Sequence, residues 1–307
     1  MQTQLRQAVV VAFGRTPYCK ARKGSFAQLH PVEYGAQTLL GVLARVPQLR
    51  PEDIGDVIMG CAMPFGVQGG NMARLIVQRA GLPDCVTAQT VNRYCSSGLQ
   101  TIATAANAIR CGEEDVVIAG GVESMSLVPM LVGAEDADPW LAEHRPEVYT
   151  TMGITAENVA RQWGISRADM DAMAVESHRR AAQAQAGGCF DGQIIPITVP
   201  GPDGGEVVVC RDEGIRPGTT AETLAGLKPC FLENGSVTAA TSSQMTDGAG
   251  FVVLMSEEKA AELGVKPLAR FVSFATGGVP AEVMGVGPIE AVPKALRKAG
   301  LTLEQMD

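Results

Sequence analysis

The first 120 residues alternate between short runs rich in β-branched residues and longer segments with helical periodicity. Alternation of this kind is typical of βαβ units around a mainly parallel sheet. The run 116–120, VVIAG, is apolar throughout, as expected of a strand covered by helices on both faces. The sequence therefore predicts an α/β fold. Its strand-like runs are 8–13, 57–61, 86–91 and 115–120, and its helical segments are 31–46, 71–80 and 97–110.

The regular alternation of strand-like and helical segments stops in 122–234, where segments are longer and richer in proline and glycine. This stretch includes two helical pieces, near 153–163 and 167–186, the second of which begins with a capping-box-like Ser-Arg-Ala-Asp. More than a hundred residues are too many for a plain connection, so we interpret 122–234 as an inserted loop domain with a specialised function. Strand-like character returns at 250–255, followed by a short helix at 257–263.

The end of the chain repeats the order of its beginning. A strand-like run at 270–275 corresponds to the one at 8–13, and the helix that opens at Gly287-Pro288 corresponds to the one that opens at His30-Pro31. The order indicates duplicated halves. We therefore expect a first half made of 1–121 plus 235–268, and the start of a truncated second half in 269–307.

Charge and composition narrow the class of protein. Hydrophobic residues make up 46% of the chain and charged residues 19%, a balance typical of soluble globular proteins. The net charge of −8 argues against a non-specific nucleic-acid binder, which needs a basic surface. No apolar run is long enough to cross a membrane, and the N-terminus lacks the pattern of a secretory signal. These features favour a cytoplasmic location.

The eight cysteines are scattered, and no C-x-x-C pair occurs. Metal clusters and disulfide frameworks both depend on recurring close spacings, so neither is predicted and reduced thiols fit best. One cysteine, Cys95, lies between a strand-like run and a helical pattern in 91–100, VNRYCSSGLQ. The helix is expected to begin near Ser96 or Ser97, since an apolar face at helical spacing follows. That face consists of Leu99, Ile102, Ala103, Ala106 and Ile109.

Two interpretations of Cys95 follow from this local pattern. At the start of a helix, free N–H groups and the positive end of the helix dipole favour negative charge on its sulfur. The same N–H groups could donate to the oxyanion of a carbonyl under attack. Cysteine is also among the most buried residue types, so the local pattern alone favours the alternative that Cys95 is a small buried hydrophobe at a turn.

Several longer strings resemble the thiolase family, in the order in which that family uses them. The resemblance covers essentially the whole chain from Val9 to Asp307. It implies a thiolase-like fold, with layered αβα halves around mainly parallel sheets. The strings are VNRYCSSGLQTIATAANAIRCGEEDVVIAGGVESMS, MGITAENVARQWGISRADMDAMAVESH, DEGIRPGTT, GSVTAATSSQMTDGAGFVVLMSE and MGVGPIEAVPKAL.

The resemblance implies an acetyl-CoA C-acyltransferase of fatty-acid β-oxidation. By that analogy Cys95 attacks the 3-keto carbon of a 3-oxoacyl-CoA, carries the acyl group as a thioester, and passes it to coenzyme A. The backbone N–H of Cys95 is implied as an oxyanion-hole donor. Coenzyme A and acyl-CoA are then substrates, with no bound cofactor and no metal. The family also implies a homodimer or tetramer.

The coenzyme-A contacts that the resemblance implies fall mostly in the inserted region. Arg216 matches the basic residue near the nucleotide, and Ser243 lies near the pantetheine arm. Thr223 and Ala239 match further positions along the ligand, and Met152 matches a residue that lines the acyl pocket.

Departures from the family pattern also carry predictions. Thr151, Thr241 and Gln244 replace residues of acetoacetyl-specific relatives, which favours a broader or longer-chain 3-oxoacyl substrate. The activating histidine of G-H-P, the second cysteine and the asparagine of N-E-A-F have no match in this sequence, and His30, His144 and His178 do not replace them. Because acid–base assistance contributes about 10²–10⁴-fold, we expect this chain alone to be inactive or nearly so.

Two other functions stay open from the sequence. A ketoacyl synthase-like condensing enzyme would share the fold and a cysteine at the same turn, although GGVESMS and the long inserted region favour a thiolase. A non-catalytic coenzyme-A-binding or assembly protein would fit a chain that lacks the activating residues.

Overall fold

The computed structural model describes residues 5–130 and 134–307. The chain divides into two compact units. The sheet unit comprises Met1–Pro129, Gly188–Gly214 and Met245–Phe271, and the helical unit comprises Met130–Gly187, Ile215–Gln244 and Val272–Asp307. The inserted region predicted at 122–234 thus contributes to both units, and the division into three segments stays a prediction.

A seven-stranded sheet forms the centre of the sheet unit. The strand order is β4-β3-β5-β8-β1-β9, with β2 beside β8. β3 pairs in parallel with β4 and β5, whereas β8 is antiparallel to β5, β1 and β2. β1 to β5 therefore all run in one direction, which confirms the mainly parallel α/β fold. The strands are β1 (Ala8–Arg15), β2 (Cys19–Lys20), β3 (Asp56–Gly60), β4 (Thr87–Val91), β5 (Val116–Glu123), β8 (Thr246–Ser256) and β9 (Ala269–Arg270).

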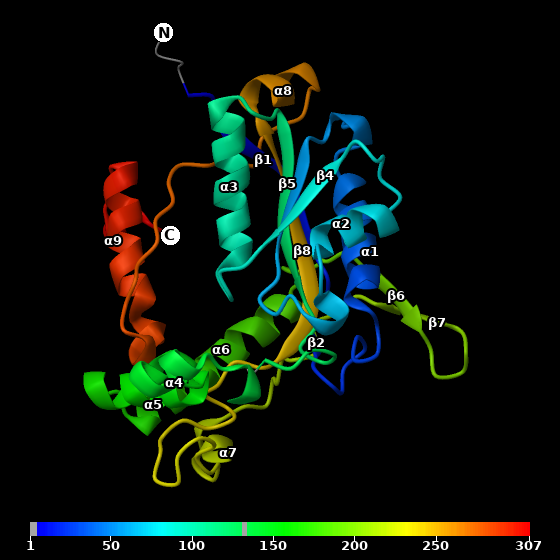
Figure 1. Cartoon of the computed structure of the whole chain (residues 1–307). Helices are drawn as coiled ribbons and strands as arrows, with labels where there is room; N and C mark the ends of the chain where they lie inside the picture. The colour runs from blue at the N-terminus through cyan, green and yellow to red at the C-terminus, as the bar shows by residue number, and fades with distance from the viewer. Residues whose placement is uncertain (1–4, 131–133) are drawn as a thin grey trace. The chain divides into compact units, whose positions relative to one another are not determined.

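Helices cover both faces of this sheet (Figure 1). α1 (Pro31–Leu43) and α2 (Met72–Arg79) lie on one face, and α3 (Ser97–Cys111) lies on the other. The larger core, under α1 and α2, includes the stacked rings of Phe26 and Tyr34. Burial of such side chains contributes about 1.5–3 kcal/mol each. The smaller core, under α3, consists of Ala8, Ile58, Ala105, Ala106, Ile109, Val117, Ala119 and Leu254.

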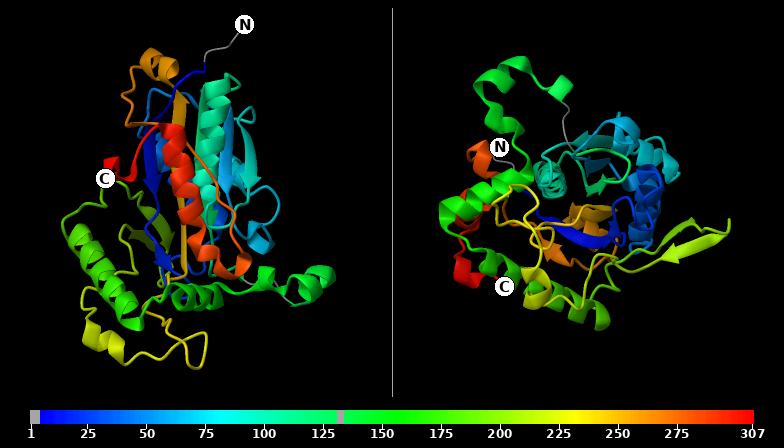
Figure 2. Two further views of the ribbon diagram at one scale, coloured as in Figure 1. Left: turned by 90° about the vertical axis from the view of Figure 1, so that its left-hand side faces the viewer. Right: turned by 90° about the horizontal axis from the view of Figure 1, so that it is seen from below.

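The sheet unit also includes a separate β-hairpin and a short helix. β6 (Ile197–Pro200) and β7 (Glu206–Val209) pair in antiparallel fashion, and the hairpin extends away from the main sheet (Figure 2). α8 (Glu257–Glu262) follows β8 and is capped by the Ser256 side chain.

The helical unit contains α4 (Pro139–His144), α5 (Met152–Trp163), α6 (Arg167–Ala186), α7 (Ala221–Ala225) and α9 (Gly287–Ala299). The capping box predicted at the start of α6 is present, since Ser166 and Asp169 bond each other's backbone N–H groups. Short 3₁₀ turns lie at Pro51–Asp53, Gly66–Gln68, Ala134–Asp136, Pro146–Tyr149, Ala281–Val286 and Leu303–Gln305.

One predicted strand is wrong for most of its length. The run 270–275 forms only the end of the two-residue β9, which pairs with Val9 and Val10 of β1. Phe271 N–H still donates to the Ala8 carbonyl, and the chain then leaves the sheet edge. Strand-like composition does not make a strand where no neighbour continues the ladder.

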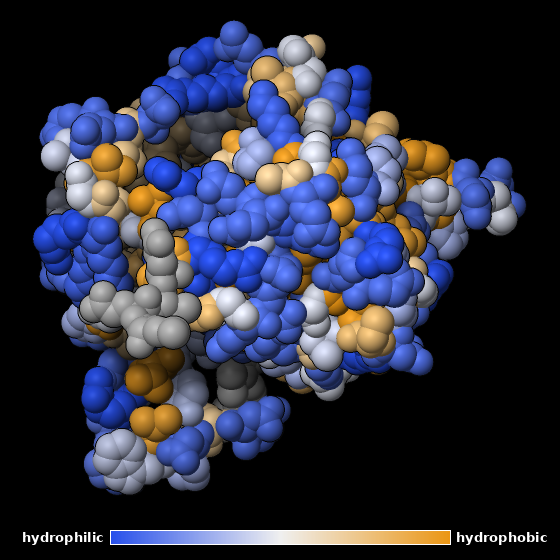
Figure 3. All heavy atoms as spheres, turned by 90° about the horizontal axis from the view of Figure 1, so that it is seen from above, coloured by the Kyte–Doolittle hydropathy of each residue, from blue (hydrophilic) through white to orange (hydrophobic). Residues whose placement is uncertain are grey.

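The molecular face in Figure 3 presents mainly hydrophilic side chains with hydrophobic ones between them. Within 5–130 and 134–307, no helix is both long and apolar enough to cross a membrane.

Candidate active site

Cys95 lies in the short turn that joins β4 to α3 in the sheet unit. Tyr94, directly before it, has φ +46°, a left-handed conformation that is unfavourable for a bulky residue. Local hydrogen bonds hold this turn. The Asn92 side chain accepts from Tyr94 N–H at 2.7 Å, and the Ser97 hydroxyl donates to the Tyr94 carbonyl at 2.6 Å. Ser97 Oγ also accepts from Arg93 N–H at 2.8 Å.

Cys95 is exposed, which rules out the interpretation that it is a small buried hydrophobe. Two other cysteines, Cys19 and Cys61, are the buried ones. Cys111, at the last position of α3, is exposed as well. All eight cysteines are free thiols.

The start of α3 has no side-chain cap. Ser96 occupies the cap position but makes no cap hydrogen bond, whereas Asn71, Ser166 and Ser256 cap α2, α6 and α8. The first N–H groups of a helix have no partner within the helix, and side chains commonly satisfy them. At α3 the Ser96 and Ser97 N–H groups donate to the carbonyls of Arg93 and Tyr94. The N–H groups of Gly98 and Leu99 are then the ones in the first turn that can meet a negatively charged atom near Cys95.

Two glycines lie beside this turn. A Cβ on Gly60, at the end of β3, would lie 2.5 Å from the Ser97 Cβ, so glycine allows β3 to approach the start of α3. A Cβ on Gly98 would have open space around it. The surface beside Cys95 is thus free of bulk on the helix side.

The exposed cysteines should react faster with an alkylating reagent than the buried ones. Burial, and after it the nearby Glu123 carboxylate, raises the pKa of the Cys61 thiol to about 12. Burial likewise raises the pKa of Cys19. With iodoacetamide near neutral pH, we expect Cys95 to react first, Cys111 more slowly, and Cys61 at least about 100-fold more slowly than Cys95. Peptide mass spectrometry of a time course measures all three, and equal rates at Cys95 and Cys61 would contradict this assignment.

The five residues predicted to contact coenzyme A all lie in the helical unit and all have exposed side chains. Met152 is the first residue of α5, and Thr223 lies in α7. The Thr223 hydroxyl oxygen accepts from Thr220 N–H at 3.0 Å as part of a capping box, and the hydroxyl also donates to the Thr220 carbonyl at 2.8 Å. Ala239 and Ser243 lie in the loop before β8.

Arg216 makes a contact that its sequence context did not predict. Its backbone N–H donates to His178 Nδ1 at 3.2 Å, which joins the DEGIRPG segment to α6. The Arg216 side chain is exposed. His178 therefore has a structural contact, and its exclusion as the catalytic base stays a prediction from the sequence.

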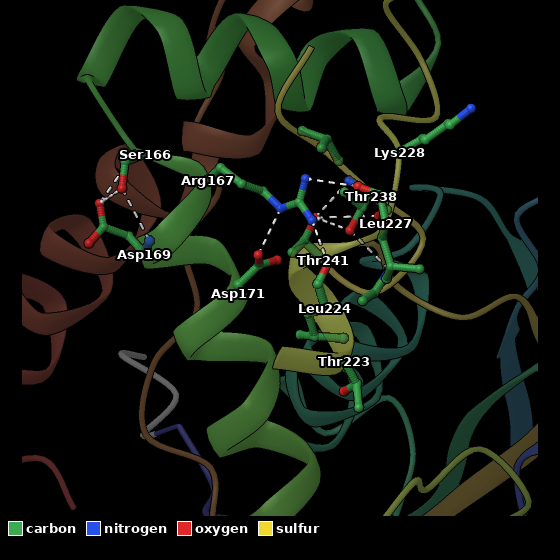
Figure 4. Close-up of polar contacts among 12 residues, drawn as sticks. Ser166, Arg167, Asp169, Asp171, Thr223, Leu224, Leu227, Lys228, Thr238 and Thr241 are labelled. Carbon is green, nitrogen blue, oxygen red and sulfur yellow. Dashed lines mark hydrogen bonds and ion pairs between the residues drawn. The ribbon is translucent and has the colours of Figure 1, made fainter. Parts of the chain in front are cut away.

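Arg167 holds the segment that carries Thr223, as Figure 4 shows. Its Nε donates to Asp171 Oδ2 at 2.8 Å, and its terminal nitrogens donate to the carbonyls of Leu224 at 2.8 Å and Leu227 at 3.2 Å. Charge-assisted bonds of this kind fix the end of α7 against α6. The i, i+4 spacing of Arg167 and Asp171 is the sequence signal that could have indicated the pair.

Glu157 is a second supporting residue that sequence reasoning missed. This carboxylate, 6% exposed, accepts from the N–H groups of Ser236 at 2.9 Å and Val237 at 2.8 Å, and from the Ser236 hydroxyl at 2.9 Å. Burial alone would raise the pKa of Glu157, but these donors outweigh it and the pKa lies below its ordinary value. Glu157 thereby anchors the loop that leads to Ala239.

Comparisons with known proteins agree with these features. The family models described as thiolase N-terminal domain and thiolase C-terminal domain match residues 8–258 and 265–307. The 3-ketoacyl-CoA thiolase of Bacillus subtilis is 50% identical over 310 residues, which span 98% of this chain and 79% of the relative. The mouse peroxisomal 3-ketoacyl-CoA thiolase A is 44% identical over 100% of this chain and 73% of the relative. The crystal structure of the Bacillus anthracis acetyl-CoA acetyltransferase superposes with a TM-score of 0.91 at 38% identity, covering 100% of this chain and 79% of that one.

Proposed function

This chain belongs to the thiolase family of acyltransferases, and we propose that it transfers acyl groups between 3-oxoacyl-CoA and coenzyme A through a thioester on Cys95. The Cys95 sulfur attacks the 3-keto carbon, and the bond between C2 and C3 breaks. The electron pair of that bond passes to C2, which takes up a proton as acetyl-CoA leaves. The thiolate of a second coenzyme A then attacks the thioester, which regenerates the Cys95 thiol.

The observation that carries this proposal is the exposed Cys95 beside the uncapped start of α3. An oxyanion forms on the carbonyl oxygen each time sulfur adds to the carbon. Backbone N–H groups that are fixed before the reaction stabilise such an oxyanion without reorganisation. We assign one of these donors to the backbone N–H of Cys95.

Coenzyme A binds, in this proposal, to the exposed residues of the helical unit. Arg216 meets the nucleotide end with its positive charge, and Ser243 meets the pantetheine arm. Thr223 and Ala239 contact the ligand between these ends, and Met152 lines the acyl pocket. The supports for this assignment are the matching motifs and the anchoring of α7 and of the loop before Ala239 by Arg167 and Glu157.

The proposed substrate is a 3-oxoacyl-CoA longer than acetoacetyl-CoA. Thr151, Thr241 and Gln244 support this range, as do the names of the relatives from Bacillus subtilis and mouse, both 3-ketoacyl-CoA thiolases. A place in fatty-acid β-oxidation follows from that substrate class. A homodimer or tetramer and a cytoplasmic location stay predictions from the sequence.

We also propose that the 307 residues bind and accept an acyl group more readily than they turn it over. Their sequence has no match to G-H-P or N-E-A-F, so no histidine is assigned to activate Cys95 for repeated cycles. A single acylation needs only the nucleophilic sulfur of Cys95 and backbone donors to the oxyanion.

Incubation with acetyl-CoA followed by peptide mass spectrometry tests the acyl-enzyme. We expect an acetyl group on the peptide that contains Cys95, and its removal by added coenzyme A. An acetylated chain that does not release the group to coenzyme A would instead support a non-catalytic coenzyme-A-binding protein. No acetylation at any concentration of acetyl-CoA would sink the nucleophile assignment.

A further inference from the structure

The turn that carries Cys95 has a backbone conformation that needs outside support. Only Arg22 and Tyr94 have positive φ among the non-glycine residues of 5–130 and 134–307. The Tyr94 side chain is 65% exposed, so packing does not hold it in place. A left-handed residue of this kind costs roughly 1–3 kcal/mol and persists only where its surroundings fix it.

Asn92 makes two hydrogen bonds that fix this turn from opposite sides. Its Oδ1 accepts from Tyr94 N–H at 2.7 Å, which closes a local turn directly before Cys95. Its Nδ2 donates to the Ala62 carbonyl at 3.0 Å, which ties the turn to the loop after β3. A single side chain thus joins the strained residue to a neighbouring strand end.

The loop that receives Asn92 is itself held by a carboxylate. Glu123, at the end of β5, accepts from Ala62 N–H at 2.7 Å and Met63 N–H at 3.3 Å. The fully buried Gln68 donates to Glu123 Oε1 at 2.7 Å and to the Met63 carbonyl at 2.9 Å. These bonds connect the ends of β3 and β5, so the Ala62 carbonyl is a rigid acceptor for Asn92.

We propose that Asn92 is a positioning residue for Cys95, an inference that rests on the proposed function of Cys95 as nucleophile. Asn92 holds Tyr94 in its left-handed conformation and thereby sets the direction of the Cys95 sulfur relative to the start of α3. Glu123 and Gln68 support Asn92 by fixing the position of the Ala62 carbonyl, to which Asn92 donates. Asn92 itself donates nothing to the reacting atoms.

The test compares three variants of the 307-residue protein. Asn92→Ala removes both hydrogen bonds, while Asn92→Ser keeps an oxygen that can accept from Tyr94 N–H. Asn71→Ala is the matched control, because Asn71 also accepts one backbone N–H and donates to one carbonyl, Ala88 at 2.8 Å, but serves α2. Two rates are measured: acetylation of Cys95 by acetyl-CoA, and alkylation of Cys95 relative to Cys111 by iodoacetamide.

We expect Asn92→Ala to slow acetylation about 10- to 100-fold and Asn71→Ala to leave it near the wild-type rate, because misplacing a reacting group by an ångström has effects of this size. Asn92→Ser should recover most of the loss, which a merely structural role would not predict. Equal acetylation rates for Asn92→Ala and Asn71→Ala would overturn the proposal.

The alkylation rates separate this inference from the proposed function. If the wild-type protein accepts no acetyl group, the proposed function fails. The positioning role is then decided by the ratio of alkylation at Cys95 to that at Cys111, which Asn92→Ala must lower. An unchanged ratio overturns it. Alkylation of the buried Cys61 reports unfolding. If Asn92→Ala causes it, Asn92→Ser replaces it in the comparison and must lower the ratio of alkylation at Cys95 to that at Cys111; an unchanged ratio then overturns the proposal.

Discussion

Replacement of Cys95 by serine is expected to abolish acylation of the protein by acetyl-CoA, to at least about 1,000-fold below the wild-type rate. A serine hydroxyl is a much weaker nucleophile than a cysteine thiol near neutral pH, and no base is assigned to activate it in this chain. The side chain is exposed at the surface of the sheet unit, so the substitution should leave the fold intact. Intact-mass spectrometry over a time course measures the adduct.

Cys111→Ser is the matched control for this experiment. Cys111 is also exposed and lies at the opposite end of the same helix, where the dipole disfavours negative charge. We expect this variant to be acylated at the wild-type rate. Loss of the adduct in Cys111→Ser with retention in Cys95→Ser would show that the wrong end of α3 had been assigned.

Glu157→Ala should destabilise the loop before Ala239 by about 3 kcal/mol, since it leaves two backbone N–H groups without their acceptor. Amide hydrogen exchange at Ser236 and Val237 measures this locally, and protection should fall roughly 100-fold. Binding of coenzyme A should weaken in the same variant, because Ala239 lies on the loop that is released.

The contribution of Glu157 to the stability of the loop before Ala239 should also depend on pH. Because the pKa of Glu157 is lowered by folding, its contribution to stability is complete above its ordinary value of 4.5 and is lost as the pH falls through the folded pKa. The difference between wild type and Glu157→Ala should therefore shrink below about pH 4.5. Glu176→Ala is the control, because Glu176 pairs with Arg179 and Arg180 at the surface and should change exchange at Ser236 very little. Equal loss of protection in both variants would contradict the anchoring role.

The elements with strong local signals were predictable from the sequence. The alternation of 8–120 correctly indicates β1, β3, β4, β5 and the three helices between them, because apolar periodicity is set by the burial of each element. α6 agrees with its predicted limits, since the capping box and the following Gly187 mark both ends. The position of Cys95 before α3 followed from the apolar face of that helix.

The parts that the sequence could not give depend on contacts between distant segments. Glu157 meets Ser236 across 79 positions, and Asn92 meets Ala62 across 30, and neither pair has a spacing rule that indicates it. The shortening of the strand at 270–275 has a similar origin, because a ladder requires a neighbour that composition cannot supply. The role proposed for Cys95 likewise rests on the ordered family motifs rather than on its local pattern.

The close approach at Gly60 has a consequence for how sequences of this kind can vary. Gly60 is the last residue of β3, but a Cβ at this position would meet the Cβ of Ser97, two positions after Cys95. Any side chain there must displace the first turn of α3, and the cysteine with it. Substitution at Gly60 is therefore limited by the approach of the helix start that follows Cys95, and a library that varies the strand freely should keep glycine at this one site.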